Sequence, residues 1–303
     1  MNQNPLVSIV LCVYNGKAFL QQQIDSILEQ TYKKFELLIL NDNSNDSSNE
    51  LIEQYLGKDT RIRYFQNETN LGFNRNFEKG FRLSEGELIA ISDQDDIWLS
   101  NKIEQLVLNL GEHMLIYSNS ELIDETGTRL NERLDSNVIH LDNPTFKSFL
   151  NDNFITGHTC LFKKELLNYA LPFPENIYFY DWWLGFTASY VGNVKYLEKA
   201  LTLYRIHDRS VMQELTVHAN RKKNRGDKKY LQLKEFSFAS FLQPDDREFI
   251  QKFLDNKRNA KKGILSFIRC YNYLLKNHQE IYPWYKKSLL KKLNFLRKQC
   301  LQA

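Results

Sequence analysis

The sequence is poor in cysteine and has neither a long apolar run nor a signal-like start, which are the marks of disulfide-rich, membrane-spanning and secreted proteins. Only four cysteines occur among 303 residues, at positions 12, 160, 270 and 300, and their spacing fits neither a disulfide framework nor a cysteine metal site. No apolar run approaches the roughly 18 residues that span a bilayer. The polar start at residues 1–5 lacks the pattern of a secretory signal. The composition therefore predicts a cytoplasmic protein with reduced cysteines.

Glycine is sparse as well. The chain has 12 glycines, and the segment Val10–Gly16, which follows the first apolar run, contains only one. A glycine-rich phosphate loop is therefore missing where many nucleotide-binding proteins carry one. The chain is 42% hydrophobic and 25% charged, which at this length is enough to build two domains, or one domain with an appendage.

Apolar runs alternate with helical periodicity through the first hundred residues. Four short runs predict strands, at 6–13, 35–40, 62–65 and 88–91, and the first two are apolar enough to be parallel strands buried on both faces. Between them, apolar residues recur at helical spacing around 20–28, 51–55 and 77–83. Alternating strands and helices predict an α/β fold with right-handed crossovers.

Polar residues follow the ends of these predicted strands. Tyr14 and Asn15 follow the first strand, Asp42 the second, and Asp93–Asp96 the fourth. Ligands bind beyond the carboxyl ends of parallel strands, so these residues are candidates for one site. Three carboxylates in four positions suit Mg²⁺ or Mn²⁺ together with a substrate diphosphate. An acidic loop that caps a helix beginning near Ser100 is the structural alternative.

Six motifs in one order resemble the family 2 glycosyltransferases of the GT-A fold. They are Ser8-Ile9-Val10 with Tyr14-Asn15-Gly16, Ser26 to Tyr32, Asn41 to Asp46, Asn70-Leu71-Gly72, Asp93-Gln94-Asp95-Asp96, and Tyr180-Asp181-Trp182-Trp183 with Tyr204-Arg205-Ile206-His207. The Asp93 to Trp98 form is similar to the bacterial branch often labelled rhamnosyltransferase-like. The resemblance implies a mixed, mostly parallel sheet flanked by helices, and an inverting sugar transfer from a nucleotide diphosphate sugar.

The resemblance also implies roles for single residues. Asp181 would be the catalytic base, and Asp95 and His207 would hold Mn²⁺ or Mg²⁺. The implied donor-binding residues are Tyr14, Asn15, Asp42, Asn74, Asp93, Asp96 and Arg205. The implied acceptor-binding residues are Gly157, His158, Trp182 and Trp183.

The second-strand motif departs from the family pattern, because Asn41 and Asn43 stand where the family commonly has Asp and Gly. Asp42 is retained. By resemblance it would accept a hydrogen bond from N3–H of uracil or thymine, which implies a UDP- or dTDP-linked donor. Asn43 is able to adopt the left-handed backbone that glycine usually supplies.

Several of these residues also have structural interpretations. Asp42 would be an N-cap or Asx-turn residue, Asp96 a cap for the next helix that also holds Asp95, and Asp181 the N-cap of a helix over 182–191. His158 would be a satisfied polar residue and His207 a structural one, and at least one of the tryptophans would pack inward. The sequence leaves both interpretations open for each residue.

Charge is distributed unevenly along the chain. Residues 255–303 hold 12 basic and 2 acidic side chains, a net charge of +10, whereas residues 1–254 hold 28 basic and 35 acidic ones. Leucines and aromatics recur in this tail at helical spacing. Basic amphipathic helices bind anionic membranes, which would suit a lipid-linked acceptor at the inner face of the plasma membrane. Packing on the catalytic domain is the alternative, and no motif indicates nucleic acid binding.

These observations predict a catalytic domain over 1–212, with a nucleotide-binding half at about 1–100 and an acceptor half at 101–212, followed by a basic helical extension at 213–303. The predicted function is sugar transfer to a saccharide or lipid-linked acceptor in bacterial surface polysaccharide synthesis. A sugar nucleotidyltransferase and a non-catalytic nucleotide-sugar-binding protein remain the alternatives.

Overall fold

The computed structural model describes residues 4–134, 139–207 and 221–301. Strands and helices alternate through the first part of the chain, as the apolar runs predict. The elements up to residue 110 are β1 (Val7–Val13), α1 (Lys17–Leu28), β2 (Phe35–Asn41), α2 (Ser48–Glu53), β3 (Ile62–Gln66), α3 (Phe73–Leu83), β4 (Leu88–Ser92), β5 (Ile97–Trp98) and α4 (Lys102–Leu110).

The second part of the chain adds strands to the same sheet and then becomes helical. Its elements up to residue 205 are β6 (Leu115–Ile123), β7 (Arg129–Arg133), η2 (Phe146–Leu150), η3 (Gly157–Thr159), β8 (Cys160–Lys163), η4 (Lys164–Leu166), α5 (Leu167–Ala170), α6 (Tyr180–Val191) and β9 (Val194–Arg205). The C-terminal elements are α8 (Arg221–Phe238), α9 (Pro244–Asn259), η5 (Ala260–Lys262), α10 (Ile264–Lys276), α11 (His278–Ile281) and α12 (Leu289–Leu301).

One mixed sheet runs through both predicted halves of the catalytic domain. Among the described residues its strand order is β3-β2-β1-β4-β8-β6-β9-β5, with β7 paired to β6. The long ladders are parallel, namely β1 with β2 and β4, β2 with β3, and β6 with β9. The antiparallel ladders of β8 and β5 are short. The predicted α/β fold with a mixed, mostly parallel sheet is confirmed.

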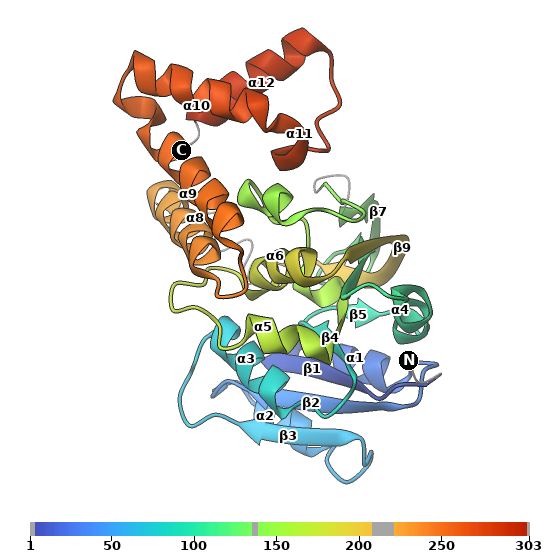
Figure 1. The fold of residues 1–303 in the computed structure, drawn as a ribbon. Coiled ribbons are helices and arrows are strands. Elements are labelled where there is room, and N and C mark those ends of the chain that lie inside the picture. Colours follow the sequence, from blue (N-terminus) through green and yellow to red (C-terminus); the bar gives the residue numbers. More distant parts are fainter. Residues whose placement is uncertain (1–3, 135–138, 208–220, 302–303) are drawn as a thin grey trace.

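The apolar runs are continuous because helices cover both faces of the sheet. In β1, Ile9 and Leu11 pack into a core with α1 and α4, whereas Val10 packs with α3 into a second core. Figure 1 shows the helices arranged on the two sides of the sheet. A strand buried on both faces has no exposed position that would call for a polar residue.

Some element boundaries differ from those that the sequence predicts. Helix α3 begins four residues before the predicted start at 77. The side-chain amide of Asn74, in the first turn of α3, bonds to the backbone of residues 177, 178 and 180. Such contacts form only in the folded protein, so periodicity does not reveal them.

The C-terminal helices stand above the sheet domain and share its core (Figure 1). Phe236 of α8 stacks on Phe186 of α6, with ring centroids 4.0 Å apart. Trp284, which follows α11, packs against Phe154, with ring centroids 4.7 Å apart. The extension therefore packs on the catalytic domain. The predicted boundary at 212 lies outside the described residues, and no described helix is long and apolar enough to cross a membrane.

Candidate active site

A cavity of about 440 Å³ lies at the carboxyl ends of β1, β2 and β4. Seven of the predicted site residues lie on its wall: Tyr14, Asp42, Asp93, Asp95, Gly157, His158 and Asp181. The wall also contains residues that the sequence prediction did not select, among them Cys12, Asn70, Phe73, Asn76, Phe77, Gln94, Thr156, Phe179, Tyr180 and Tyr204. The cavity thus combines a carboxylate cluster with an aromatic wall.

Gln94 joins the two loops that follow β1 and β4. Its side-chain oxygen accepts the backbone N–H of Tyr14 over 2.8 Å, and its amide nitrogen donates to the Tyr14 carbonyl over 3.1 Å. A Cβ atom on Gly16 would lie 2.4 Å from the Gln94 side-chain oxygen. The sequence prediction missed Gln94, although its position inside the acidic motif is a signal that could have identified it.

The carboxylate of Asp42 is buried and holds the loop that leads into α3. One oxygen accepts the side-chain amide of Asn67 at 2.7 Å and the backbone N–H of Leu71 at 2.8 Å, and the other accepts the N–H of Gly72 at 2.9 Å. Asp42 therefore neither caps α2, whose N-cap is Ser47, nor forms an Asx turn with it. Its carboxylate still borders the cavity.

The three carboxylates after β4 occupy different environments. The Asp93 side chain is 38% exposed, that of Asp95 is 18% exposed, and that of Asp96 is fully buried. Asp95 Oδ2 lies 2.9 Å from His207 Nε2, so the predicted metal pair is in contact. Asp96 accepts the backbone N–H of Arg205 and caps no helix, because α4 begins with Asn101 as its N-cap.

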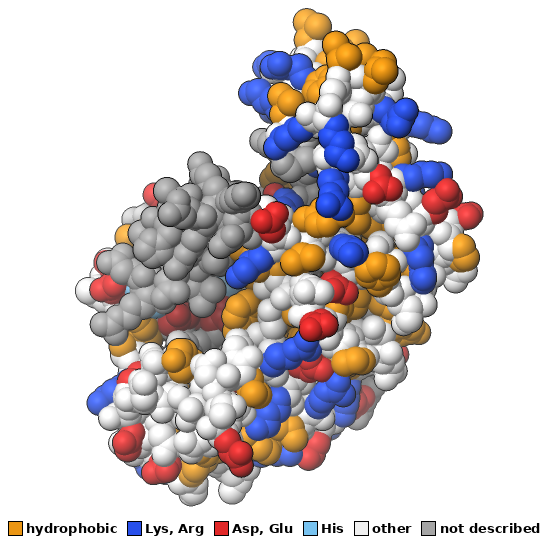
Figure 2. Space-filling model, turned by 90° about the vertical axis from the view of Figure 1, so that its left-hand side faces the viewer, with side chains coloured by type: hydrophobic (Ala, Val, Ile, Leu, Met, Phe, Trp, Pro, Cys, Tyr) orange, Lys and Arg blue, Asp and Glu red, His pale blue; other side chains and the backbone are white. Residues whose placement is uncertain are grey.

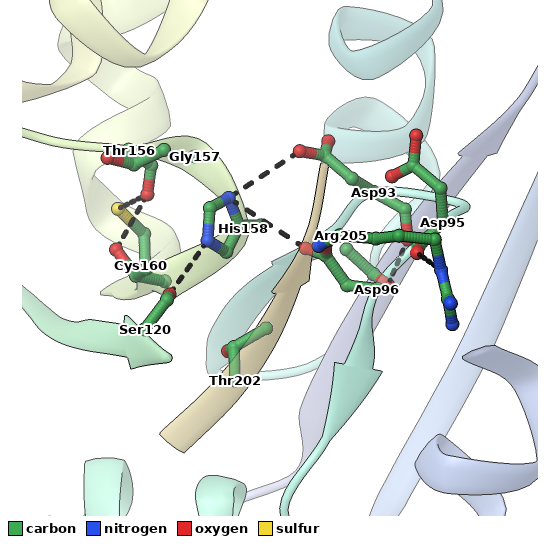
Figure 3. Close-up of polar contacts among 12 residues, drawn as sticks. Asp93, Asp95, Asp96, Ser120, Thr156, Gly157, His158, Cys160, Thr202 and Arg205 are labelled. Carbon is green, nitrogen blue, oxygen red and sulfur yellow. Dashed lines mark hydrogen bonds and ion pairs between the residues drawn. The ribbon is translucent and has the colours of Figure 1, made fainter. Parts of the chain in front are cut away.

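His158 faces the other two carboxylates (Figure 3). Its Nδ1 lies 3.6 Å from Asp93 Oδ2 and 3.9 Å from Asp96 Oδ2, which is too long for direct hydrogen bonds. Its Nε2 lies 2.9 Å from Ser120 Oγ, and its ring stacks on Tyr204. Burial opposes a charge on His158, but the charges of Asp96 and Asp93 outweigh burial and raise its pKa.

Two sets of side chains offer ligands that suit a divalent cation. In the first, ligand atoms of Asp93, Asp96 and His158 lie within 4.8 Å of one another, and Asp96 Oδ2 and His158 Nδ1 are buried without a hydrogen-bond partner. Asp95 and His207 form the second set, in which His207 Nδ1 has no partner. Carboxylate oxygens with imidazole nitrogen fit Mn²⁺, which accepts both ligand types.

Lys102 is a buried residue that the sequence prediction missed. Its Nζ donates to the carbonyl of His158 at 2.6 Å and to Thr202 Oγ1 at 2.8 Å, above the ring of Trp98. Burial lowers the pKa of Lys102 and raises that of Asp96, each to about 7. Lys102 anchors the η3 turn, which carries His158, to β9. At the start of a helix its sequence position gives no signal of burial.

Asp181 lies in the first turn of α6 and borders the cavity. Its carboxylate accepts the side-chain amide of Asn153 and the backbone N–H groups of Trp182 and Gly157. Burial raises its pKa to about 6, although these hydrogen bonds pull the pKa down. The helix begins at Tyr180 with Phe179 as its N-cap, so the N-cap interpretation of Asp181 is wrong.

Gly157 is required at its position by Tyr180. A Cβ atom at residue 157 would lie 2.2 Å from the Tyr180 hydroxyl oxygen. The space beside Gly157 is therefore filled by this protein's own tyrosine, whereas we expected it to be left for a sugar. The backbone N–H of Gly157 remains directed at Asp181.

The structure places Arg205 away from the cavity, contrary to its predicted role in donor binding. Its guanidinium donates to the carbonyls of Asp95, Asp124 and Glu125 and to the side chain of Gln22, and it lies over the ring of Phe19. Four of its five N–H groups are thereby used inside the protein. Arg205 braces the acidic loop against the turn after β6.

Both tryptophans of the predicted acceptor site pack inward. Trp182 and Trp183 are 3% and 4% exposed, and their indole N–H groups donate to the carbonyls of Phe149 and Ala170. Neither side chain borders the cavity, because α6 turns this part of its surface toward the core. The prediction that they contact the acceptor is therefore corrected.

Two residues that were predicted to contact the donor form hydrogen bonds within the protein. The side-chain amide of Asn74 donates to the carbonyls of Ile177 and Tyr178, which precede α6. Asn74 does not border the cavity. Asn15 has a positive φ of 52°, and its side-chain oxygen accepts the backbone N–H of Asn45. It shapes the loop after β1 and likewise does not border the cavity.

Comparison with known proteins shows the family of this chain. The model of glycosyl transferase family 2 matches residues 8–170. A relative from Campylobacter jejuni, named GalNAc(5)-diNAcBac-PP-undecaprenol beta-1,3-glucosyltransferase, is 27% identical over 300 residues, which cover 96% of this chain and 90% of the relative.

Two solved structures share the fold at low sequence identity. The first is S. aureus TarS 1–349 in complex with UDP-GlcNAc, with 17% identity, a TM-score of 0.60, and coverage of 97% of this chain and 88% of that one. The second is a mannosyltransferase from Pyrobaculum calidifontis in complex with GDP-Man and Mn²⁺, with 13% identity, a TM-score of 0.60, and coverage of 99% and 86%. Since the family model covers more than half of the chain, and the chain has the GT-A-like fold, this protein belongs to glycosyl transferase family 2 and is a glycosyltransferase.

Proposed function

We propose that this protein is a metal-dependent, inverting glycosyltransferase. It takes a sugar from a UDP- or dTDP-linked donor and passes it to a saccharide or lipid-linked acceptor in bacterial surface polysaccharide synthesis. The observation that carries the proposal is the placement of Asp181, a carboxyl group with a pKa of about 6, on the wall of the cavity that also holds Asp93 and Asp95. A carboxyl group with that pKa is ionised near neutral pH and is a stronger base than an ordinary aspartate.

The reaction requires one base and one place for the leaving diphosphate. Asp181 accepts the proton of the acceptor hydroxyl while that oxygen bonds to the anomeric carbon. The bond from the anomeric carbon to the diphosphate oxygen breaks, and the nucleoside diphosphate leaves with its electron pair. A single displacement of this kind inverts the anomeric configuration. A bound Mn²⁺ or Mg²⁺ would neutralise the diphosphate charge.

Separate groups of residues hold the donor. Tyr14, Asp42 and Asp93 border the cavity at the strand ends, where we place the nucleoside. Asp95 and His207, which are in contact, are the proposed metal ligands. The set formed by Asp93, Asp96 and His158 is the second candidate, because two of its buried atoms lack a partner.

The proposed acceptor class and location are supported by a relative and by the cysteines. The Campylobacter jejuni relative is named for an undecaprenol-linked saccharide, and it covers nearly the whole chain. The four cysteines are free, which agrees with a cytoplasmic enzyme. We propose that the enzyme works peripherally at the inner face of the plasma membrane.

A donor screen tests the proposal. The protein is incubated with UDP-, dTDP- and GDP-linked sugars, including dTDP-rhamnose, with and without Mn²⁺, together with saccharide and lipid-linked acceptors. We expect transfer from a UDP- or dTDP-linked donor, and NMR of the product should show the inverted anomeric configuration. A product with retained configuration contradicts the single displacement. Donor binding without any product would favour the non-catalytic alternative.

A further inference from the structure

Large apolar side chains are exposed at the starts of two C-terminal helices. In α10, Ile264 and Leu265 are 76% and 77% exposed, and in α12, Leu289 and Leu290 are 66% and 80% exposed. Scattered exposed leucines are normal on a protein surface, but here four lie in two adjacent pairs on helices that pack together. In Figure 2, hydrophobic side chains gather at the top of the molecule, over these helices.

Basic side chains surround these pairs. Lys261 and Lys262 precede the first pair, and Lys286, Lys287 and Lys291 flank the second, all of them exposed. Figure 2 shows Lys and Arg bordering the apolar side chains. We call these nine residues the apical face. Residues 255–303 contain two acids, Asp255 and Glu280. Glu280 forms an ion pair with Lys147 at 2.9 Å.

A second cavity lies beside the Leu289–Leu290 pair. It has a volume of about 310 Å³, and its wall includes His278, Lys286, Lys287 and Lys292. Lys292 Nζ lies 2.9 Å from His278 Nε2, and His278 Nδ1 faces the carbonyl of Leu275 at 2.9 Å. Both ring nitrogens of His278 thus have a polar partner within the protein. Three lysines around a cavity of this size suit a phosphate group.

We propose that the apical face docks on an anionic phospholipid bilayer. The isoleucine and leucines enter the boundary between headgroups and acyl chains, the lysines contact lipid phosphates, and the second cavity takes one headgroup phosphate. Docking accounts for the exposure of both the apolar and the basic side chains. A second copy of the chain docked through the same face is a poor occupant, since its residues 255–303 would bring another net charge of +10 against this face.

This inference adds an attachment surface to the proposed peripheral location. Binding is measured without donor or acceptor, so it stands or falls independently of the proposed transfer reaction. The full-length protein is co-sedimented with neutral phosphatidylcholine vesicles and with vesicles containing about one third phosphatidylglycerol. We expect binding to the anionic vesicles only, and we expect it to fall steeply when salt is raised to about 1 M, where the Debye length is about 3 Å.

Paired variants separate the two components of the surface. The double change Lys286→Glu and Lys287→Glu should lower the partition coefficient about fivefold or more for each lysine. The double change Leu289→Ser and Leu290→Ser should lower it about tenfold or more, because apolar area no longer leaves water. The matched controls are Lys33→Glu with Lys58→Glu, and Leu108→Ser, a leucine of α4 that is 72% exposed.

The controls should bind vesicles like the unaltered protein, and thermal unfolding should confirm that every variant is folded. Equal binding to neutral and anionic vesicles would overturn the proposal, and so would unchanged binding of the leucine pair variant. Analytical ultracentrifugation measures whether a second copy of the chain binds the apical face instead. If the protein self-associates through the leucine pair and does not bind vesicles, the apical face is a dimer interface instead.

Discussion

The backbone N–H of Gly157 donates a hydrogen bond of 3.0 Å to the carboxylate of Asp181. Gly157 begins the η3 turn, whose next residue, His158, faces Asp93 and Asp96. The proposed base and the acidic cluster are thus held by neighbouring residues of one short turn. A shift of this turn would move both halves of the proposed chemistry together.

Replacing Asp181 with Asn tests the proposed base. The amide keeps the shape of the side chain but does not accept the acceptor's proton. We expect kcat to fall by about 10² to 10⁴, with nearly unchanged affinity for the donor. Steady-state kinetics and donor titration measure the two quantities. If the variant transfers sugar at the original rate, the base lies elsewhere, and Glu165 and Glu175 are the next residues to replace.

The pH dependence of the unaltered enzyme should report the same group. Asp181 accepts a proton only when ionised, so kcat/KM should rise with pH through an apparent pKa of about 6. The folded-state pKa is raised above that of the unfolded chain. The contribution of Asp181 to stability is therefore full below about pH 4 and is lost as pH rises through about 6.

In Asp181→Asn that contribution no longer varies with pH. The variant should therefore lose less stability than the unaltered protein between pH 4 and pH 7, as urea titrations at several pH values would measure. Parallel stability curves for the two proteins would show that burial does not perturb this carboxyl group.

Replacing Gly157 with Ala tests the fit between η3 and α6. The new methyl group would overlap the Tyr180 hydroxyl, so the turn must shift. We expect a loss of about 1 to 3 kcal/mol in the free energy of unfolding, together with a lower kcat. Tyr180→Phe removes the overlapping oxygen, and the double variant should recover part of both losses. Additive effects in the double variant would contradict the contact.

Metal binding distinguishes the two candidate ligand sets. Asp95→Ala should abolish Mn²⁺-dependent donor binding, and His207→Ala should weaken Mn²⁺ affinity about 10- to 100-fold if Asp95 and His207 are ligands. Titration of Mn²⁺ by electron paramagnetic resonance measures this without turnover. Loss of Mn²⁺ in His158→Ala, with His207→Ala unaffected, would assign the metal to Asp93, Asp96 and His158. Full activity in EDTA would remove the metal from the mechanism.

Replacing Lys102 with Met tests the buried charge cluster. The change removes two hydrogen bonds and the positive charge with which Lys102 interacts with Asp96. We expect a loss of about 3 to 5 kcal/mol in the free energy of unfolding, measured by urea denaturation. Asp96→Asn in the same chain should offset part of that loss, because the buried Asp96 carboxylate is then absent. Independent, additive losses would mean that the two residues do not interact.

The order of apolar runs was enough to predict the strands of the first half of the sheet. Strands such as β1 and β2 are covered on both faces, so nearly every position in them is apolar and the pattern is unmistakable. The polar residues at their ends could be assigned to one site for the same reason, since parallel strands end at a common edge. Asp42, Asp93, Asp95 and Asp181 all border the cavity.

The direction and partners of individual side chains were decided only by the tertiary structure. Arg205 and Trp182 carry functional groups that suit a sugar nucleotide. The N–H groups of both side chains instead donate hydrogen bonds to backbone carbonyls that lie far away in the sequence. Lys102 is buried because η3 and β9 supply its acceptors, and neither is near it in sequence.

In the C-terminal helices, too, the sequence determines some properties and the tertiary packing decides others. Their sequence determines that they are basic and amphipathic, with leucines at helical spacing. Packing decides which leucines are covered: Leu274 and Leu296 are buried between the helices, whereas Leu289 and Leu290 remain in water. Spacing fixes the angle at which a side chain leaves its helix. Only the neighbouring helices determine whether anything lies in that direction.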